Sequence, residues 1–196
     1  MERKAYLLTT NEFSERTIFS KSVLERVGFT VILFNAIYDK NPLLSHRKSY
    51  LKICEEIANS SNGWYYVFED DINILEEIKL DEIIQYESIS TNVFYLGICK
   101  YGKNTLKNTG IKINDKDVFE ISDNVRGLHA VAYSNKGAKD FLNFSENYKT
   151  YEYIDMILEL YTIKNPAIVV RSDLESYISG HYGIFFQDRN KFPSTI

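Results

Sequence analysis

Short apolar segments alternate with segments of helical periodicity along most of the chain, and this alternation constrains the fold more than any other feature. The apolar segments, which we expect to be strands, are residues 5–8, 30–34, 64–68, 93–96, 128–133 and 168–170. The segments that we expect to be helices are 12–27, 45–59, 80–87, 135–144 and 152–162. Strands separated by helices predict an α/β fold with a mostly parallel sheet and helices on both faces. In such folds ligands bind at the carboxyl ends of the strands.

Capping residues mark the ends of the first two expected helices. Asn11 is expected to cap the first helix at its amino end, and Gly28 follows its last apolar residue and should end it. Ser45 is expected to cap the second helix. Residues 99–116 are rich in Gly, Asn and Lys and have little periodicity, which predicts a surface loop with a hairpin.

The size and composition indicate one globular domain. The chain has 196 residues, of which 44% are hydrophobic and 26% are charged, and this excludes collagen-like and disordered classes. We therefore expect a single domain over residues 1–196, with 180–196 as a carboxyl-terminal tail. The two cysteines, Cys54 and Cys99, are too few and too far apart to suggest a disulfide scaffold or a zinc site.

Charge and hydropathy limit the partners and the location. The formal net charge of −4 argues against a nucleic-acid-binding protein, because such a protein needs a basic face. The longest apolar run, at 30–34, is far shorter than the roughly 20 residues needed to cross a bilayer, and the amino terminus lacks the apolar region of a signal peptide. We expect a cytoplasmic protein without a transmembrane segment, peripheral to a membrane at most.

The segment with the clearest chemistry is 64–71, where an aromatic strand ends in three consecutive carboxylates, Glu69, Asp70 and Asp71. Three adjacent negative charges repel one another, and a hard cation such as Mn²⁺ or Mg²⁺ relieves this repulsion. Such cations are usually held by one or two carboxylates together with substrate phosphates. In extended backbone Glu69 and Asp71 point to the same side, so we expect them to face the metal. The alternative is a solvated turn in which Asp70 or Asp71 caps a following helix.

Residues 66–72 resemble the Leu-Glu-Asp-Asp-Val element of glycosyltransferase family 25, which comprises lipooligosaccharide galactosyltransferases and their collagen-modifying relatives. Four further stretches resemble that family in the same order, namely 6–8 with Arg16, Ser45 with His46, 127–138 and 153–158. Together they span most of the chain, from about Tyr6 to Leu160.

The resemblance implies a GT-A-like, Rossmann-related fold, a divalent metal, and a UDP-sugar donor whose anomeric carbon is inverted on transfer. The expected function is transfer of galactose or glucose to a hydroxyl group of a glycan or glycosylated protein. Thr9 and Arg16, in the opening segment, are the candidates for donor contacts, and Arg126, beside Gly127, is a candidate for phosphate or acceptor contacts. At the metal, Glu69 and Asp71 are expected to bind Mn²⁺ or Mg²⁺, and Asp70 is expected to support them.

Inverting transfer needs a general base for the acceptor hydroxyl, and the family pattern makes Asp155 the candidate. The alternative is that Asp155 only stabilises the dipole of the helix in whose first turn it lies. Lys100, Lys103 and Lys107 are further candidates for phosphate or acceptor contacts, against the alternative of a solvated loop.

The carboxyl-terminal run from Gly180 to Pro193 is glycine-punctuated, aromatic and charged. One hypothesis makes it a lid over the donor, with His181 completing the metal shell and Asp188 or Arg189 contacting the sugar or the diphosphate. In the other hypothesis its phenylalanines fill an apolar groove and His181 makes a hydrogen bond. Of the other histidines, we interpret His129 as a core residue, while His46 either meets the nucleotide or is exposed.

Other functional classes are less consistent with the sequence. Gly-x-Ser-x-Gly, Walker and Gly-x-Gly-x-x-Gly motifs are absent, which disfavours hydrolase, phosphate-loop and dinucleotide-binding functions. Two alternatives to a glycosyltransferase stay open. One is a metal-dependent nucleotidyltransferase that uses the same carboxylates, and the other is an inert nucleotide- or sugar-binding module of the same fold.

Overall fold

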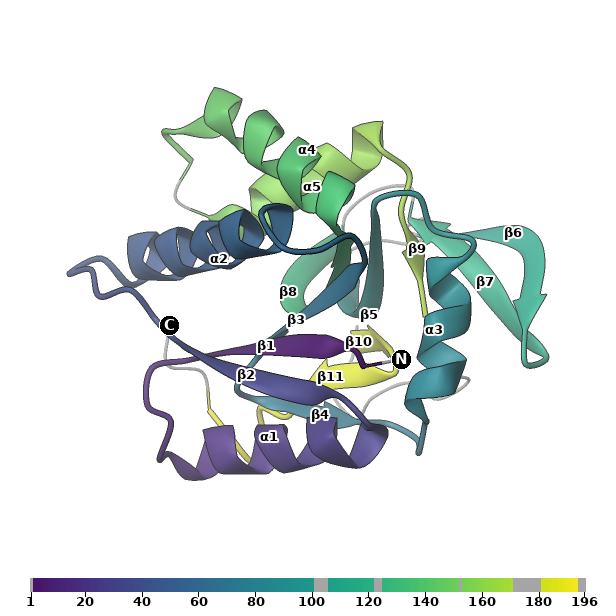
Figure 1. The fold of residues 1–196 in the computed structure, drawn as a ribbon, viewed down its shortest axis with the longest axis horizontal. Helices are drawn as coiled ribbons and strands as arrows, with labels where there is room; N and C mark the ends of the chain where they lie inside the picture. The colour runs from purple at the N-terminus through teal and green to yellow at the C-terminus, as the bar shows by residue number, and fades with distance from the viewer. Residues whose placement is uncertain (1, 101–105, 122–124, 152, 171–180, 194–196) are drawn as a thin grey trace.

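A mixed nine-stranded sheet forms the centre of the described part of the molecule (Figure 1). The computed structural model describes residues 2–100, 106–121, 125–151, 153–170 and 181–193. The strands, in the order in which they pair, are β2 (Thr30–Asn35), β1 (Lys4–Thr9), β3 (Trp64–Glu69), β8 (Val125–Ser134), β5 (Val93–Lys100), β9 (Ile168–Val169), β7 (Lys116–Ile121) and β6 (Leu106–Ile113), while β10 (His181–Gly183) also pairs with β5.

Most strands of this sheet run in one direction. β1 is parallel to β2 and β3, and β5 is parallel to β9. β8 is inserted antiparallel between β3 and β5, and β7 and β10 also run antiparallel to their neighbours. The predicted α/β class with a mostly parallel sheet is therefore confirmed, whereas periodicity alone did not predict the direction of β8.

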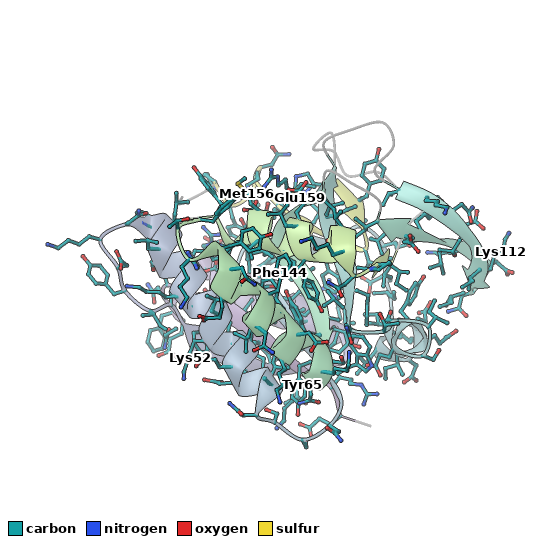
Figure 2. The ribbon with its side chains drawn as sticks, turned by 90° about the horizontal axis from the view of Figure 1, so that it is seen from above. Lys52, Tyr65, Lys112, Phe144, Met156 and Glu159 are labelled. Carbon is teal, nitrogen blue, oxygen red and sulfur yellow. The ribbon has the colours of Figure 1, made fainter. Side chains whose placement is uncertain are left out.

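Helices cover both faces of the sheet. On one face α1 (Glu15–Val27) and α3 (Leu80–Glu87) bury Val23, Leu24 and Ile83 in a core that includes Phe68 of β3. On the other face lie α2 (Pro42–Ala58), α4 (Asn135–Ser145) and α5 (Ile154–Lys164), with the short 3₁₀ helix Glu146–Tyr148 after α4. Figure 2 shows these three helices side by side above the sheet. Among the helices of the described residues, none combines the length and apolarity that crossing a bilayer requires.

The two helices beside the acidic segment begin at caps other than those predicted. Ser14 caps α1, its hydroxyl accepting from the Thr17 amide at 3.3 Å, so the prediction of Asn11 is wrong. Asn41 caps α2, its side chain accepting from the Leu43 amide at 2.9 Å, so the prediction of Ser45 is also wrong. Asparagine and serine are both good caps, and Pro at the next position favours the earlier start. Gly28 ends α1 as predicted, with φ of 114°.

The segment predicted as a loop with a hairpin contains the hairpin of β6 and β7, which extends the sheet beyond β9. The hairpin turns at Asn114 and Asp115, whose φ angles of 50° and 63° are tolerated well by these residue types. Residues 101–105 of the predicted loop, including Lys103, lie outside the described residues.

The carboxyl-terminal segment pairs with other strands of the fold and does not form a separate tail. β10 pairs with β5, and β11 (Phe185–Gln187) pairs with β4 (Ile72–Ile74), which directly follows the acidic triplet. A Cβ at Gly97 would lie 2.1 Å from the carbonyl oxygen of Phe185, so glycine is what allows this close approach. The Phe185 ring is fully buried against Phe68 of β3, 5.0 Å between centroids. Gly180 and residues 194–196 lie outside the described residues.

Candidate functional site

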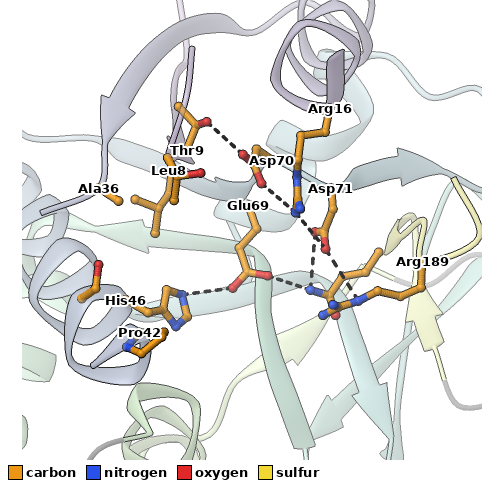
Figure 3. A pocket seen from close by; sticks show the side chains of 13 residues that line it. Leu8, Thr9, Arg16, Ala36, Pro42, His46, Glu69, Asp70, Asp71 and Arg189 are labelled. Carbon is orange, nitrogen blue, oxygen red and sulfur yellow. Dashed lines mark hydrogen bonds and ion pairs between the residues drawn. The ribbon is translucent and has the colours of Figure 1, made fainter. Parts of the chain in front are cut away.

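A cavity of about 200 Å³ lies where β1, β2 and β3 end, at the sheet edge where ligands of α/β folds bind (Figure 3). The acidic triplet forms one wall of the cavity, the amino end of α2 forms another, and Gln187 of β11 and Arg189 line a further side. Its lining residues are Leu8, Thr9, Thr10, Arg16, Ala36, Pro42, Ser45, His46, Glu69, Asp70, Asp71, Gln187 and Arg189.

Asp70 is bound to the elements behind the cavity. Its Oδ2 accepts hydrogen bonds from the hydroxyl groups of Thr9 at 2.9 Å and Thr17 at 3.2 Å, and its Oδ1 lies 2.8 Å from Arg16 Nη2. The hydroxyl of Ser20 donates to the backbone carbonyl of Asp70 at 2.9 Å. Asp70 therefore ties the end of β3 to β1 and α1, and its oxygens already have partners.

Asp71 lies between two arginines that come from opposite ends of the chain. Its Oδ2 is 3.4 Å from Arg16 Nη2 and 3.6 Å from Arg189 Nε. Figure 3 shows Arg16 reaching from α1 towards Asp70 and Asp71, with Arg189 on the other side of Asp71. Burial, and then the charge of Glu69, raises the pKa of Asp71 to about 7, although both arginines act in the other direction. A cation near Asp71 would favour its ionised form.

Glu69 is held by His46 of α2 and by Gln187 of β11. Its Oε1 lies 3.1 Å from His46 Nε2, and its Oε2 accepts a hydrogen bond from Gln187 Nε2 at 2.7 Å. Burial acts to raise the pKa of Glu69, but the hydrogen bond and charge of His46 outweigh it and lower the pKa. Conversely, burial acts to lower the pKa of His46, and Glu69 outweighs it and raises the pKa.

Glu69 and Asp71 lie on the same side of the chain, as alternation along the backbone predicts. A single atom, Gln187 Nε2, contacts both, at 2.7 Å from Glu69 Oε2 and 3.4 Å from Asp71 Oδ1. Two carboxylate oxygens that converge on one donor suit a hard cation whose other positions are filled by water and phosphate. Within the described residues, no group of three or more His, Cys, Asp and Glu side chains is placed to hold a metal ion. A cation here would therefore be held by this pair of carboxylates.

His181 is not among the residues that line the cavity. The Sγ atom of Cys99 lies 3.7 Å from both ring nitrogens of His181, and the His181 ring centroid is 5.8 Å from that of His129. His129 is fully buried, as predicted for a core histidine. The tail residue that reaches the carboxylates is Gln187 rather than His181.

Asp155 lies in the first turn of α5, half-buried, with Oδ1 accepting from the Met156 amide at 2.9 Å. It is not one of the lining residues of the cavity, but its helix contacts α2, which carries His46. Arg126 of β8 pairs with Glu159, one turn further along α5, at 3.2 Å. Lys107 lies on the β6–β7 hairpin.

Three residues important to the site were not singled out from the sequence. Thr17 and Ser20 are fully buried polar residues on the inner face of α1, and Gln187 is a buried polar residue in an otherwise aromatic strand. The signal that was available is the interruption of an apolar pattern by a polar residue, because buried polar groups need partners.

Comparison with known proteins gives no close relative. No protein-family model matches the chain, and no curated protein matches it. The chain is similar to the crystal structure of A197 from STIV, with a TM-score of 0.46 and 12% identity over 86% of this chain and 81% of that chain. It is also similar to the apo form of the glycosyltransferase GlyE in Streptococcus pneumoniae TIGR4, with a TM-score of 0.46 and 10% identity over 85% of this chain and 44% of that one.

A third similar structure is UDP-glucose pyrophosphorylase complexed with UDP-glucose, with a TM-score of 0.43 and 11% identity over 86% of this chain and 89% of that chain. At TM-scores below 0.5 we derive no function from these structures. Membership of glycosyltransferase family 25, which the motifs suggest, stays a prediction.

Proposed function

We propose that the chain is a metal-dependent inverting glycosyltransferase of GT-A-like fold that transfers galactose or glucose from a UDP-sugar to a hydroxyl group of a glycan or glycosylated protein. The observation that carries this proposal is the cavity at the ends of β1 and β3. It combines a convergent carboxylate pair, Glu69 and Asp71, with two guanidinium groups, Arg16 and Arg189. A hard cation and arginines together are the groups that recognise a diphosphate.

The roles of the chain's residues in donor binding follow from their positions. Arg16 and Arg189 flank Asp71 and would donate hydrogen bonds to the phosphate oxygens. Glu69 and Asp71 would hold Mn²⁺ or Mg²⁺, which when bound stabilises the negative charge of the departing diphosphate as a Lewis acid. Asp70 and Thr9 would act indirectly, because their hydrogen bonds with one another and with Thr17 fix the wall behind the phosphates.

The transfer itself requires a base on the face of the sugar opposite the diphosphate. Asp155 would accept the proton of the acceptor hydroxyl. The hydroxyl oxygen would then form a bond to the anomeric carbon while the bond from that carbon to the diphosphate oxygen breaks. The contact of the Asp155 helix, α5, with α2, which carries His46, supports this role.

The proposal is tested by calorimetric titration of UDP with and without Mn²⁺. We expect Mn²⁺-dependent binding to the wild type and its loss in Asp71→Asn, which keeps the shape of the side chain. The matched control is Glu77→Gln, because Glu77 is an exposed carboxylate with a side chain 79% accessible. Failure of UDP to bind in either condition would contradict the proposal.

Turnover separates the proposed function from its alternatives. A glycosyltransferase should release UDP slowly from UDP-galactose or UDP-glucose in the presence of Mn²⁺, and faster with an acceptor. A nucleotidyltransferase would instead transfer the uridylyl group of UTP to a sugar phosphate and release pyrophosphate. Tight binding of UDP without either reaction would indicate a binding module.

A further inference from the structure

The amide of Gln187 lies where oxygens of Glu69 and Asp71 converge. Its Nε2 is within hydrogen-bonding distance of both Glu69 and Asp71, and the Gln187 residue is only 7% exposed. The amide group donates but carries no net charge, so it satisfies one oxygen of each carboxylate without neutralising either.

The backbone of Gln187 is firmly held. β11 pairs with β4 in a register that places Gln187 opposite Ile72, and the Asp188 amide donates to the carbonyl oxygen of Asp71 at 2.8 Å. Further along, Phe192 packs on Phe19 of α1, 5.5 Å between ring centroids. Displacement of Gln187 from the carboxylates would therefore involve a rotation of its side chain rather than a shift of β11.

We propose that Gln187 competes with the divalent cation, its amide bridging Glu69 and Asp71 in the metal-free protein and leaving them when the cation binds. This inference rests on the cation site of the proposed function and adds how that site is regulated. The cation must displace two charge-assisted hydrogen bonds, which weakens its binding to the protein alone.

A nucleotide diphosphate offsets this cost. Its phosphate oxygens supply ligands to the cation and also give the displaced Gln187 amide a new acceptor. Cation and UDP therefore bind with positive coupling, each raising the affinity for the other by the same factor. Gln187 makes the site respond to the cation–nucleotide complex more than to the free cation.

The test is titration of Mn²⁺ without nucleotide, followed by the electron paramagnetic resonance signal of free Mn²⁺. Gln187→Ala should bind Mn²⁺ about tenfold more tightly than the wild type, because the competing hydrogen bonds are gone. Gln85→Ala is the matched control, since Gln85 is an exposed glutamine of α3, and should bind as the wild type does. Unchanged or weaker binding to Gln187→Ala would overturn the inference.

A second variant guards against loss of folding in Gln187→Ala. Gln187→Glu places a third carboxylate beside Glu69 and Asp71, so its melting temperature should rise in Mn²⁺ by at least about 3 °C more than that of the wild type. No additional rise would count against the inference.

The two proposals fail in different ways. If the wild type binds Mn²⁺ with UDP but Gln187→Ala gains nothing, the competition by Gln187 is wrong and the glycosyltransferase proposal stands. If neither protein binds Mn²⁺, with or without UDP, the cation site itself is wrong and this inference falls with it.

Discussion

The guanidinium group of Arg16 lies 2.8 Å from Asp70 and 3.4 Å from Asp71, so one arginine at the start of α1 is shared by two consecutive carboxylates at the end of β3. The side chain of Arg16 is 17% exposed and lines the cavity. Because Asp70 is fixed by Thr9 and Thr17, Arg16 is held in place before any ligand arrives. Preorganisation of this kind lowers the entropy cost of binding a phosphate.

Replacement of Arg16 should weaken the nucleotide site. Arg16→Gln should lower the affinity for UDP, measured by calorimetry in Mn²⁺, by at least about tenfold, because a charge-assisted contact with phosphate is lost. Arg26→Gln is the matched control, since Arg26 lies on the same helix, is 54% exposed and pairs only loosely with Glu77 at 3.8 Å. Equal affinities in the two variants would show that Arg16 does not contact the nucleotide.

Asp70 should matter more for stability than for cation binding. Asp70→Asn should lower the free energy of unfolding by about 2–4 kcal/mol, because the buried Asp70 is the nearest counter-charge of the half-buried Arg16. Urea unfolding gives the measurement. Asp140→Asn, which breaks an exposed helical pair with Lys136, should cost less than about 0.5 kcal/mol. If Asp70→Asn lowers the free energy of unfolding no more than the control does, Asp70 does not have this stabilising role.

The elements of the fold could be predicted from the sequence where they depend on local patterns. Gly28 ends α1 because the left-handed conformation there favours glycine, and that requirement is visible in the sequence. The start of α2 was misplaced, because Asn41 and Ser45 are both acceptable caps and the choice between them depends on the packing of the helix. The antiparallel insertion of β8 and the pairing of β10 and β11 depend on contacts between distant segments, which periodicity does not encode.

In the candidate site, too, only the features that depend on local patterns could be predicted from the sequence. That Glu69 and Asp71 face one side follows from the alternation of side chains in an extended chain. The partners of these residues could not be predicted, because Gln187 lies more than 110 positions away and reaches them only through the pairing of β11 with β4. Asp70, expected to support a metal, turns instead towards hydroxyl groups of β1 and α1.

Asp155 should be required for transfer but not for binding of the donor. Asp155→Asn should lower kcat for transfer by about 10²–10⁴-fold, because the acceptor hydroxyl loses its base, while the Kd for UDP stays within about twofold. Asp81→Asn is the matched control, since Asp81 is likewise an acid in the first turn of a helix, α3, and shares any dipole effect. Full transfer activity in Asp155→Asn would assign the base elsewhere.

His129 should make the folded state sensitive to acid. Burial, and then the nearby imidazole of His181, lowers the pKa of His129 from 6.5 to about 4. Between these two values the unfolded chain binds a proton at this position and the folded chain does not. Stability from His129 is therefore complete above pH 6.5 and is lost as the pH falls towards 4, by about 3 kcal/mol at most.

A comparison with His129→Gln isolates this contribution, because glutamine keeps a donor that can reach the Phe185 carbonyl, which lies 3.3 Å from His129 Nε2, but does not titrate. The difference in unfolding free energy between wild type and variant, measured by urea unfolding, should shift by about 2–3 kcal/mol in favour of the variant between pH 7.5 and 4.5. Other groups, including Asp71, titrate in both proteins and largely cancel in the difference. A difference independent of pH would mean that His129 is protonated as readily in the folded state as in the unfolded chain.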